Sequence, residues 1–493
     1  MTPRLSQATL SSLPAQVARP AYDRAAVQTG VVHLGIGAFH RAHQAVVFDD
    51  ALAAGDLRWG VVGASLRSPG VRDQLVPQDG LYGLHVRDGD GAAVRIIGAV
   101  QDVLVAPEDP AALLERMAAP DTHLITLTVT EKGYRLDPAS GALIESDPDV
   151  AADLADLSRP RTAPGFLTAA LARRRTEGRG PLTVISCDNL PHNGTRVLDA
   201  VLAMAARHDA GLRDWIAETC AFPATMVDRI VPATTADDID AAATRLGVRD
   251  EGLVLTEPFT QWVIEDRFAG ARPDFEAFGA RLTSSVAPWE DAKLRLLNGA
   301  HSAIAYLGGL AGLEFVHQVV AEPAFRTYVD RLWDEAQTTL DPPPGLDLAA
   351  YRRDLMARFA NPALNHRTRQ IAMDGSQKLP QRLLAGCAIR LDRDQPIDAL
   401  AVAVAAWMRW QDGRDDAGRT FVVDDPLASK AGRLVADAPD PAGRARALLS
   451  IRAVFPARLA EDARFAEVVV SAHASLDERG AKGAVAALLE TAA

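Results

Sequence analysis

A lysine, an asparagine and a histidine lie close together in the run KLRLLNGAH, as Lys293, Asn298 and His301. In an α-helix, residues 293, 297 and 301 share one stripe, and Asn298 neighbours His301. A dehydrogenase that works without a metal needs a base for the hydroxyl proton and neutral donors for the developing alkoxide. Lysine can be that base if burial lowers its pKa toward neutrality, and asparagine amides can be the donors. On spacing alone, an ordinary amphipathic helix with a solvated lysine and a capping asparagine is the favoured interpretation.

A glycine-containing turn, GIGAFH at residues 35–40, follows the apolar run 31–34 and precedes a helical pattern over residues 42–54. Glycines at such a turn let the backbone approach a pyrophosphate at the start of a helix. His40 replaces the third glycine, so a tight turn with no ligand explains the motif equally well. The residues expected to bind the cofactor here are Gly35, Ile36, Gly37, Ala38 and Phe39.

The end of the second expected strand, residues 64–68 (ASLRS), bears on the choice of cofactor. A carboxylate at this position normally holds the adenosine ribose hydroxyls, and none is present. Arg67, beside Ser68, is instead placed to accept a 2′-phosphate. The choice of NAD over NADP is therefore weaker than the choice of a nicotinamide cofactor: NAD is expected, with NADP not excluded.

Two further strand ends carry polar side chains. Asp188 and Asn189 follow an apolar run, where open α/β sheets bind ligands, although such residues before proline are also routine turn formers. Asp228 and Arg229 stand inside the apolar run MVDRIVP, and we predict that they contact the substrate. A buried ion pair between them is the competing interpretation.

Basic side chains gather in the segments HRTRQ (366–370) and DGSQK (374–378). Cations suit a carboxylate or a hydroxyl-rich substrate, and a solvated helix end explains the same residues. The predicted substrate contacts are His366, Arg369 and Lys378. No metal site is expected, because no HxxxH or HxxE pair lies on a helix and Arg41 stands between His40 and His43.

The order of the expected elements indicates an α/β fold. Short β-branched runs alternate with helical segments in the first half, which predicts a Rossmann-type parallel sheet covered by helices. Long Ala/Leu/Arg-rich segments follow, so we predict a NAD-binding domain over 1–285 and a mostly α-helical substrate domain over 286–493. The expected strands are 31–34, 59–66, 94–100, 123–130 and 182–186, and the expected helices include 292–310, 324–340, 348–359, 397–410 and 442–449.

Composition limits the possible partners and compartment. The net charge of −12 argues against nucleic acid and anionic membranes, and leaves a small molecule as the expected partner. The three cysteines, Cys187, Cys220 and Cys387, form no CxxC pair and are expected to be reduced. Residues 1–20 lack the apolar core of a signal peptide, and no coiled-coil signature is present. We therefore expect a cytoplasmic monomer.

In this order the motifs resemble the long-chain mannitol dehydrogenase family of polyol-specific dehydrogenases, from Val31 to about Gln381. The resemblance implies a general base at Lys293, alkoxide donors at Asn298 and Asn189, and a substrate-orienting group at His301. It implies a Rossmann-type domain and a helical domain with the active site between them. It also implies that Gly35, Gly37, Phe39 and the TEKGY loop, which begins with Thr130 and Glu131, face the cofactor.

Within the family, the chain looks most similar to the fructuronate reductase branch. The similar phrases are HLGIGAFHRAHQA, LTVTEKGY, SCDN, FPATMVDRIVPA, EPFTQWVIED and QIAMDGSQKLPQRLL. Mannitol dehydrogenases carry an arginine eight residues before the lysine that matches Lys378, where this chain has Gln370. The expected reaction is therefore the interconversion of D-mannonate and D-fructuronate, and the alternative is that of a mannitol 2-dehydrogenase or a related polyol dehydrogenase.

Overall fold

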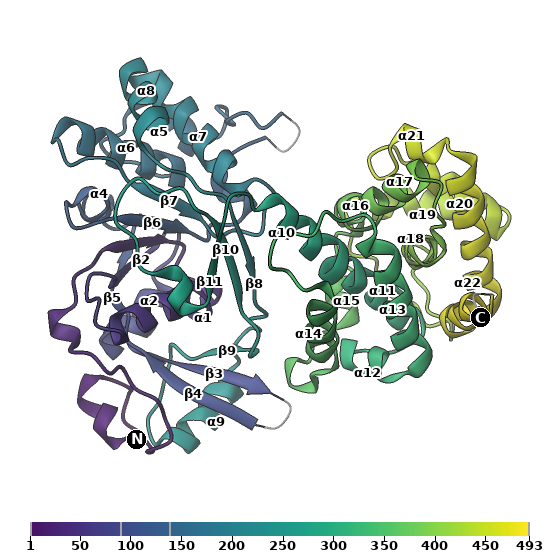
Figure 1. Ribbon diagram of the computed structural model, residues 1–493, viewed down its shortest axis with the longest axis horizontal. Helices are drawn as coiled ribbons and strands as arrows, with labels where there is room; N and C mark the ends of the chain where they lie inside the picture. Colours follow the sequence, from purple (N-terminus) through teal and green to yellow (C-terminus); the bar gives the residue numbers. More distant parts are fainter. Residues whose placement is uncertain (1, 89–90, 138–139, 492–493) are drawn as a thin grey trace. The chain divides into compact units, whose positions relative to one another are not determined.

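The computed structural model describes residues 2–88, 91–137 and 140–491 (Figure 1). The chain divides into two units, Met1–Ala287 and Pro288–Ala493. The boundary expected from the sequence lies after residue 285. The first unit mixes strands and helices, and every named element of the described part of the second unit is a helix.

A parallel sheet of five strands forms the centre of the first unit, in the order β5-β2-β1-β6-β7. Side chains that alternate along each strand enter two separate cores. Val31 and Leu124 pack on one face, and Val32 and Ile125 pack on the other, so both faces are buried as a parallel sheet requires. The Rossmann-type prediction is confirmed. The strands are β1 (Val31–Leu34), β2 (Val61–Ser65), β5 (Val100–Val105), β6 (Leu124–Leu127) and β7 (Thr183–Ser186).

The prediction of a third parallel strand over residues 94–100 is wrong. The apolar run contains a break at Gly98, whose missing Cβ would lie 2.7 Å from Pro20 Cγ. Residues before the break end β4 (Gly91–Ile97), which pairs antiparallel with β3 (Tyr82–Asp88), and Val100 begins β5. The strand β9 (Val254–Thr256) completes this small sheet, and β8 (Thr225–Asp228), β10 (Gln261–Glu265) and β11 (Ala280–Thr283) form another.

Helices cover the central sheet of the first unit. The helix expected over 42–54 corresponds to α2, and the short helix α1 comes before it; the two are separated at His43, which leaves helical geometry with φ −124° and ψ −84°. The α-helices of this unit are α1 (Ala38–Ala42), α2 (Gln44–Ala53), α3 (Gly70–Leu75), α4 (Pro110–Ala118), α5 (Pro148–Ala155), α6 (Ala163–Thr176), α7 (Asn193–His208), α8 (Ala210–Thr219), α9 (Ala236–Leu246) and the start of α10 (Ala287–Ala292).

The second unit is built around α18 (Asp398–Trp410), which is buried along nearly its whole length. The long helix α22 (Ala463–Glu490) packs against α18 and α20, and it is kinked at Gly480, where φ is 66° (Figure 1). No helix among the described residues is long and apolar enough to span a membrane. The remaining helices are α11 (Gly299–Leu310), α12 (Val316–Ala321), α13 (Pro323–Gln337), α14 (Leu348–Ala360), α15 (Thr368–Ile371), α16 (Gly375–Leu379), α17 (Ala385–Asp392), α19 (Ala428–Asp437), α20 (Pro441–Leu449) and α21 (Ala457–Ala460).

Two turns of the second unit are π-helical. The segment expected as a continuous α-helix over 292–310 contains the π-helix η6 (Lys293–Asn298) between α10 and α11. The second is η8 (Pro380–Leu384), between α16 and α17. Hydrogen bonds from i to i+5 widen such a turn, so the α-helical stripe predicted for residues 293, 297 and 301 is wrong in its spacing.

Candidate active site

The turn after β1 is shaped to let a ligand approach its backbone. Gly35 has φ +92°, and a Cβ there would lie 2.2 Å from the carbonyl oxygen of Thr128, so only glycine fits. A Cβ on Gly37 would meet nothing closer than 3.9 Å. Gly63 leaves room for the Ile36 side chain, whose Cδ1 would otherwise lie 2.1 Å from its Cβ. Since β1 and β6 flank the point where strand order reverses, this is where an open α/β sheet binds a ligand.

His40, in place of the third glycine, has a packing role. Its ring stacks on His33 of β1 with centroids 3.4 Å apart, and both side chains are fully buried. His33 contacts Thr126 Oγ1 at 2.7 Å and Thr128 Oγ1 at 2.8 Å, which ties β1 to β6. Burial lowers the pKa of His33 to about 3, so the pair stays neutral. An imidazole stack therefore fills the space between helix and strand that a third glycine would leave.

The loop after β6 is held under strain at Thr130, which has φ 64° and ψ 168°. A β-branched residue rarely adopts this conformation, and such strain concentrates at functional sites. The carboxylate of Asp188 accepts hydrogen bonds from Val129 N at 3.1 Å, Thr130 N at 2.8 Å and Tyr134 Oη at 2.7 Å. Burial raises the pKa of Asp188. Asp188 thus fixes the loop from the end of β7.

The other predicted residues of the first unit border the carboxyl ends of the strands. Gly37, Arg67, Thr130, Glu131 and Asn189 are exposed, Ala38 and Phe39 are half-buried, and Ile36 is buried. Arg67 lies two residues beyond the end of β2. Together with the glycine turn, these residues follow the carboxyl ends of β1, β2, β6 and β7.

Arg229 uses its guanidinium within the protein. It donates to the carbonyl oxygens of Ala42 and Glu257, the latter at 3.1 and 3.3 Å. Burial lowers the pKa of Arg229 to about 10. These contacts give Arg229 a role in joining the end of β8 to α1 and β9. Asp228 is buried beside it, 6% exposed, and the assignment of both residues to substrate contact stays a prediction.

Lys293, Asn298 and His301 are all buried in the second unit, 7%, 9% and 8% exposed. The π-turn places Lys293 and Asn298 one widened turn apart, at i and i+5. The ring of His301 lies 4.7 Å from Phe359 and 5.2 Å from His366, between centroids. Burial, followed by the charges of His366, Arg358 and Arg382, lowers the pKa of His301 well below its usual value. A neutral imidazole is therefore available to a hydroxyl group.

The three predicted substrate contacts of the second unit have different surroundings. His366 lies beside His301. Arg369 is exposed, with its guanidinium over the Phe421 ring at 5.1 Å. Lys378 Nζ donates to the carbonyl oxygen of Met373 at 2.5 Å, and burial and the charge of Arg382 lower its pKa. The sequence interpretation missed Arg382, because nothing local to it indicates that it meets a helix eighty residues earlier.

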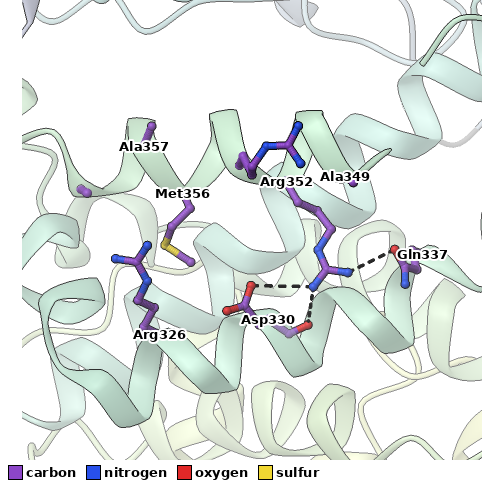
Figure 2. Close-up of a pocket in the computed structure, with 9 residues that line it drawn as sticks. Arg326, Asp330, Gln337, Ala349, Arg352, Met356 and Ala357 are labelled. Carbon is purple, nitrogen blue, oxygen red and sulfur yellow. Dashed lines mark hydrogen bonds and ion pairs between the residues drawn. The ribbon is translucent and has the colours of Figure 1, made fainter. Parts of the chain in front are cut away.

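A hollow of about 670 Å³ lies elsewhere in the second unit, between α13 and α14 (Figure 2). Its Arg352 reaches Asp334 at 2.7 Å and Asp330 at 3.7 Å, so carboxylates compensate this charge. None of the predicted site residues lines it. Within the residues that the structure describes, no three His, Cys, Asp or Glu side chains are grouped to hold a metal ion.

Comparisons with known proteins match both units. Residues 29–277 match the mannitol dehydrogenase Rossmann domain, and residues 285–477 match the mannitol dehydrogenase C-terminal domain. Relatives in Escherichia coli strain K12 include the uncharacterized oxidoreductase YeiQ, 45% identical over 96% of this chain and 97% of the relative. D-mannonate oxidoreductase of the same strain is 42% identical over 97% and 99%. Mannitol 2-dehydrogenase of Pyrenophora tritici-repentis is 40% identical over 97% and 85%.

Solved structures give the same match over the whole chain. Pseudomonas fluorescens mannitol 2-dehydrogenase, in a ternary complex with NAD and D-mannitol, has a TM-score of 0.85 at 36% identity, over 99% of both chains. A substrate-free D-sorbitol dehydrogenase has a TM-score of 0.92 at 32% identity, over 98% of this chain and 100% of the other.

Proposed function

The chain belongs to the mannitol dehydrogenase family, and from that premise we propose that it is an NAD-dependent enzyme that interconverts D-mannonate and D-fructuronate. The observation that carries the proposal is the burial of Lys293, Asn298 and His301 on one helical segment. A buried amine, amide and neutral imidazole are the groups that a metal-independent alcohol oxidation needs. The relative named D-mannonate oxidoreductase supports the sugar-acid substrate.

The glycine turn and the strained loop of the first unit support the cofactor assignment. Gly35 and Gly37 keep the carboxyl edge of the sheet open, and Thr130 and Glu131 border it. When bound there, NAD supplies the acceptor for the hydride that leaves the substrate carbon.

The residues of this chain then transfer the hydroxyl proton and stabilise the substrate oxygen. In the oxidative direction, neutral Lys293 takes the proton from the C5 hydroxyl of D-mannonate. The amide of Asn298 donates a hydrogen bond to the alkoxide oxygen as its charge develops. His301, kept neutral by burial, orients a substrate hydroxyl. In the reductive direction, Lys293 returns its proton to the carbonyl oxygen of fructuronate.

The test is substrate profiling with purified protein, followed by loss of NADH absorbance. We expect strong turnover of D-fructuronate, weak turnover of D-fructose, and weaker activity when NADPH replaces NADH. Preference for D-fructose would overturn the sugar-acid assignment in favour of a mannitol 2-dehydrogenase, the second candidate, which the solved relative with D-mannitol favours. Preference for NADPH would overturn the NAD assignment and direct attention to Arg67.

A further inference from the structure

The π-helical segment η8 places Arg382 against the helix that carries Lys293, Asn298 and His301. A Cβ on Gly299 would lie only 3.0 Å from the carbonyl oxygen of Arg382, so the two segments meet at a glycine. The two π-turns, η6 and η8, also pack against each other. Because π-turns occur frequently at functional sites, this junction is a candidate for substrate contact.

The guanidinium of Arg382 is incompletely used within the protein. Its Nη1 donates to Ser302 Oγ at 3.1 Å, one residue after His301. Its Nε is buried without an acceptor, and within the described ranges no carboxylate lies at ion-pairing distance from it. A buried N–H group without an acceptor is costly, so such a group usually has a partner.

Another arginine of the same unit shows what a structural guanidinium looks like here. Arg390 is 6% exposed and donates to Pro396 O at 2.6 Å, Glu335 O at 3.2 Å and Thr338 Oγ1 at 2.5 Å. Its Nε and Nη1 atoms both donate to main-chain or hydroxyl oxygens. Arg382 lacks this set of acceptors, which leaves donors available for a ligand.

The imidazole of His301 interacts electrostatically with Arg382 and has an unused ring nitrogen. The Nε2 atom of His301 is buried without a hydrogen-bond partner in the part of the chain that the structure describes. Burial lowers the pKa of His301, and its electrostatic interactions with His366, Arg358 and Arg382 lower it further. A guanidinium near a neutral imidazole suits an anion that also carries hydroxyl groups.

We propose that Arg382 binds the carboxylate of the sugar-acid substrate and thereby sets the preference for sugar acids over uncharged polyols. A planar guanidinium can bind a carboxylate through two parallel hydrogen bonds. This assignment rests on the proposed function.

The two cations predicted from the sequence are less suited to this role. Lys378 already donates to Met373 O, and Asp374, Asp425 and Asp424 counter its charge. Arg369 is exposed and lies over Phe421.

The experiment measures kcat/KM of the variants R382Q, R382K and R390Q on D-fructuronate and D-fructose. D-fructuronate carries a carboxylate where D-fructose carries a hydroxymethyl group. Losing one partner of a buried charged pair corresponds to about a 30- to 5,000-fold effect. We expect R382Q to lose kcat/KM by that factor on D-fructuronate and by less than about threefold on D-fructose. R382K keeps the charge without the planar fork, so a smaller but still selective loss is expected. R390Q should affect both substrates equally, through stability.

Binding gives a second readout that needs no turnover. In thermal-shift measurements, D-mannonate should stabilise the wild-type protein more than D-mannitol does, and R382Q should lose that difference. Equal losses on both substrates, or a retained mannonate shift in R382Q, would overturn the role of Arg382 alone. If R382Q does not fold, R382K decides by the same comparison. A wild-type protein that favours D-fructose and D-mannitol would overturn the proposed function and this assignment together.

Discussion

Replacing Asp188 by Asn tests how the strained loop at Thr130 is held. The carboxylate of Asp188 accepts from Val129 N, Thr130 N and Tyr134 Oη, at 3.1, 2.8 and 2.7 Å. An asparagine turns one of the two acceptor oxygens into a donor, which then faces either Thr130 N–H or the Val129 and Tyr134 donors. A buried donor left unsatisfied costs about 1–3 kcal/mol.

This cost is similar to the strain stored in a residue at an unfavourable backbone conformation, about 1–3 kcal/mol. Asp188→Asn therefore removes about as much stabilisation as the Thr130 conformation requires, and we expect the loop to relax to negative φ. If the loop contacts the cofactor, affinity for NADH falls by about 5- to 150-fold, the same range converted at 1.4 kcal/mol per factor of ten. Titration of NADH fluorescence measures the change directly.

Asp153 offers a matched control in the same unit. It accepts from Arg161 N at 2.8 Å, Thr162 N at 2.9 Å and Thr162 Oγ1 at 2.6 Å, and it is also buried. Asp153→Asn should lower the melting temperature by a similar amount and leave NADH affinity unchanged. Equal NADH affinities for the two variants would refute the reasoning that Asp188 positions a cofactor loop.

Further predictions concern the turn and the buried histidines. Gly35→Ala places a Cβ 2.2 Å from Thr128 O and should lower both the melting temperature and the affinity for NADH. Gly37→Ala has open space around its Cβ and should lower only the affinity for NADH. A G37A protein that binds NADH normally would argue against a close approach of the cofactor to Gly37. Burial lowers the pKa values of His33, His85 and His473 to about 3, 4 and 4, against 6.5 in the unfolded chain. Below pH 6.5 the unfolded state binds more protons, so stability should fall as pH drops from 6.5 to about 4, by about 1.4 kcal/mol per pH unit for each histidine. His473→Leu should flatten the pH dependence of the urea midpoint, and an unchanged slope would contradict this assignment.

Local sequence patterns predicted those parts of the fold that depend on neighbouring residues in the chain. The apolar run before Gly35 and the helical texture after residue 285 correspond to β1 and to a helical second unit. The misplaced third strand shows the limit, since β4 and β5 join at Gly98 into one apolar run whose division depends on packing against Pro20. The π-turn at Lys293 has the same local composition as an α-helix, so hydrophobic periodicity does not reveal it.

The sequence predicted which residue types form the candidate site, but it did not predict which side chains contact them. The role of His40 depends on His33, a stacking partner on another element. Arg382 meets Ser302, and Asp188 meets Thr130, only after the chain has folded. Motif spacing reports one segment at a time, and these contacts join segments that are distant in sequence.

The most direct test of the central claim is the turnover of Lys293→Ala with D-fructuronate and NADH, beside Lys430→Ala, which alters an exposed lysine of α19. Loss of a proton-transfer group costs about 10²–10⁴-fold in rate, so we expect a fall of that size in K293A and none in K430A, with NADH affinity unchanged in both. Turnover by K293A within a few-fold of wild type would contradict the role of Lys293 as the catalytic base.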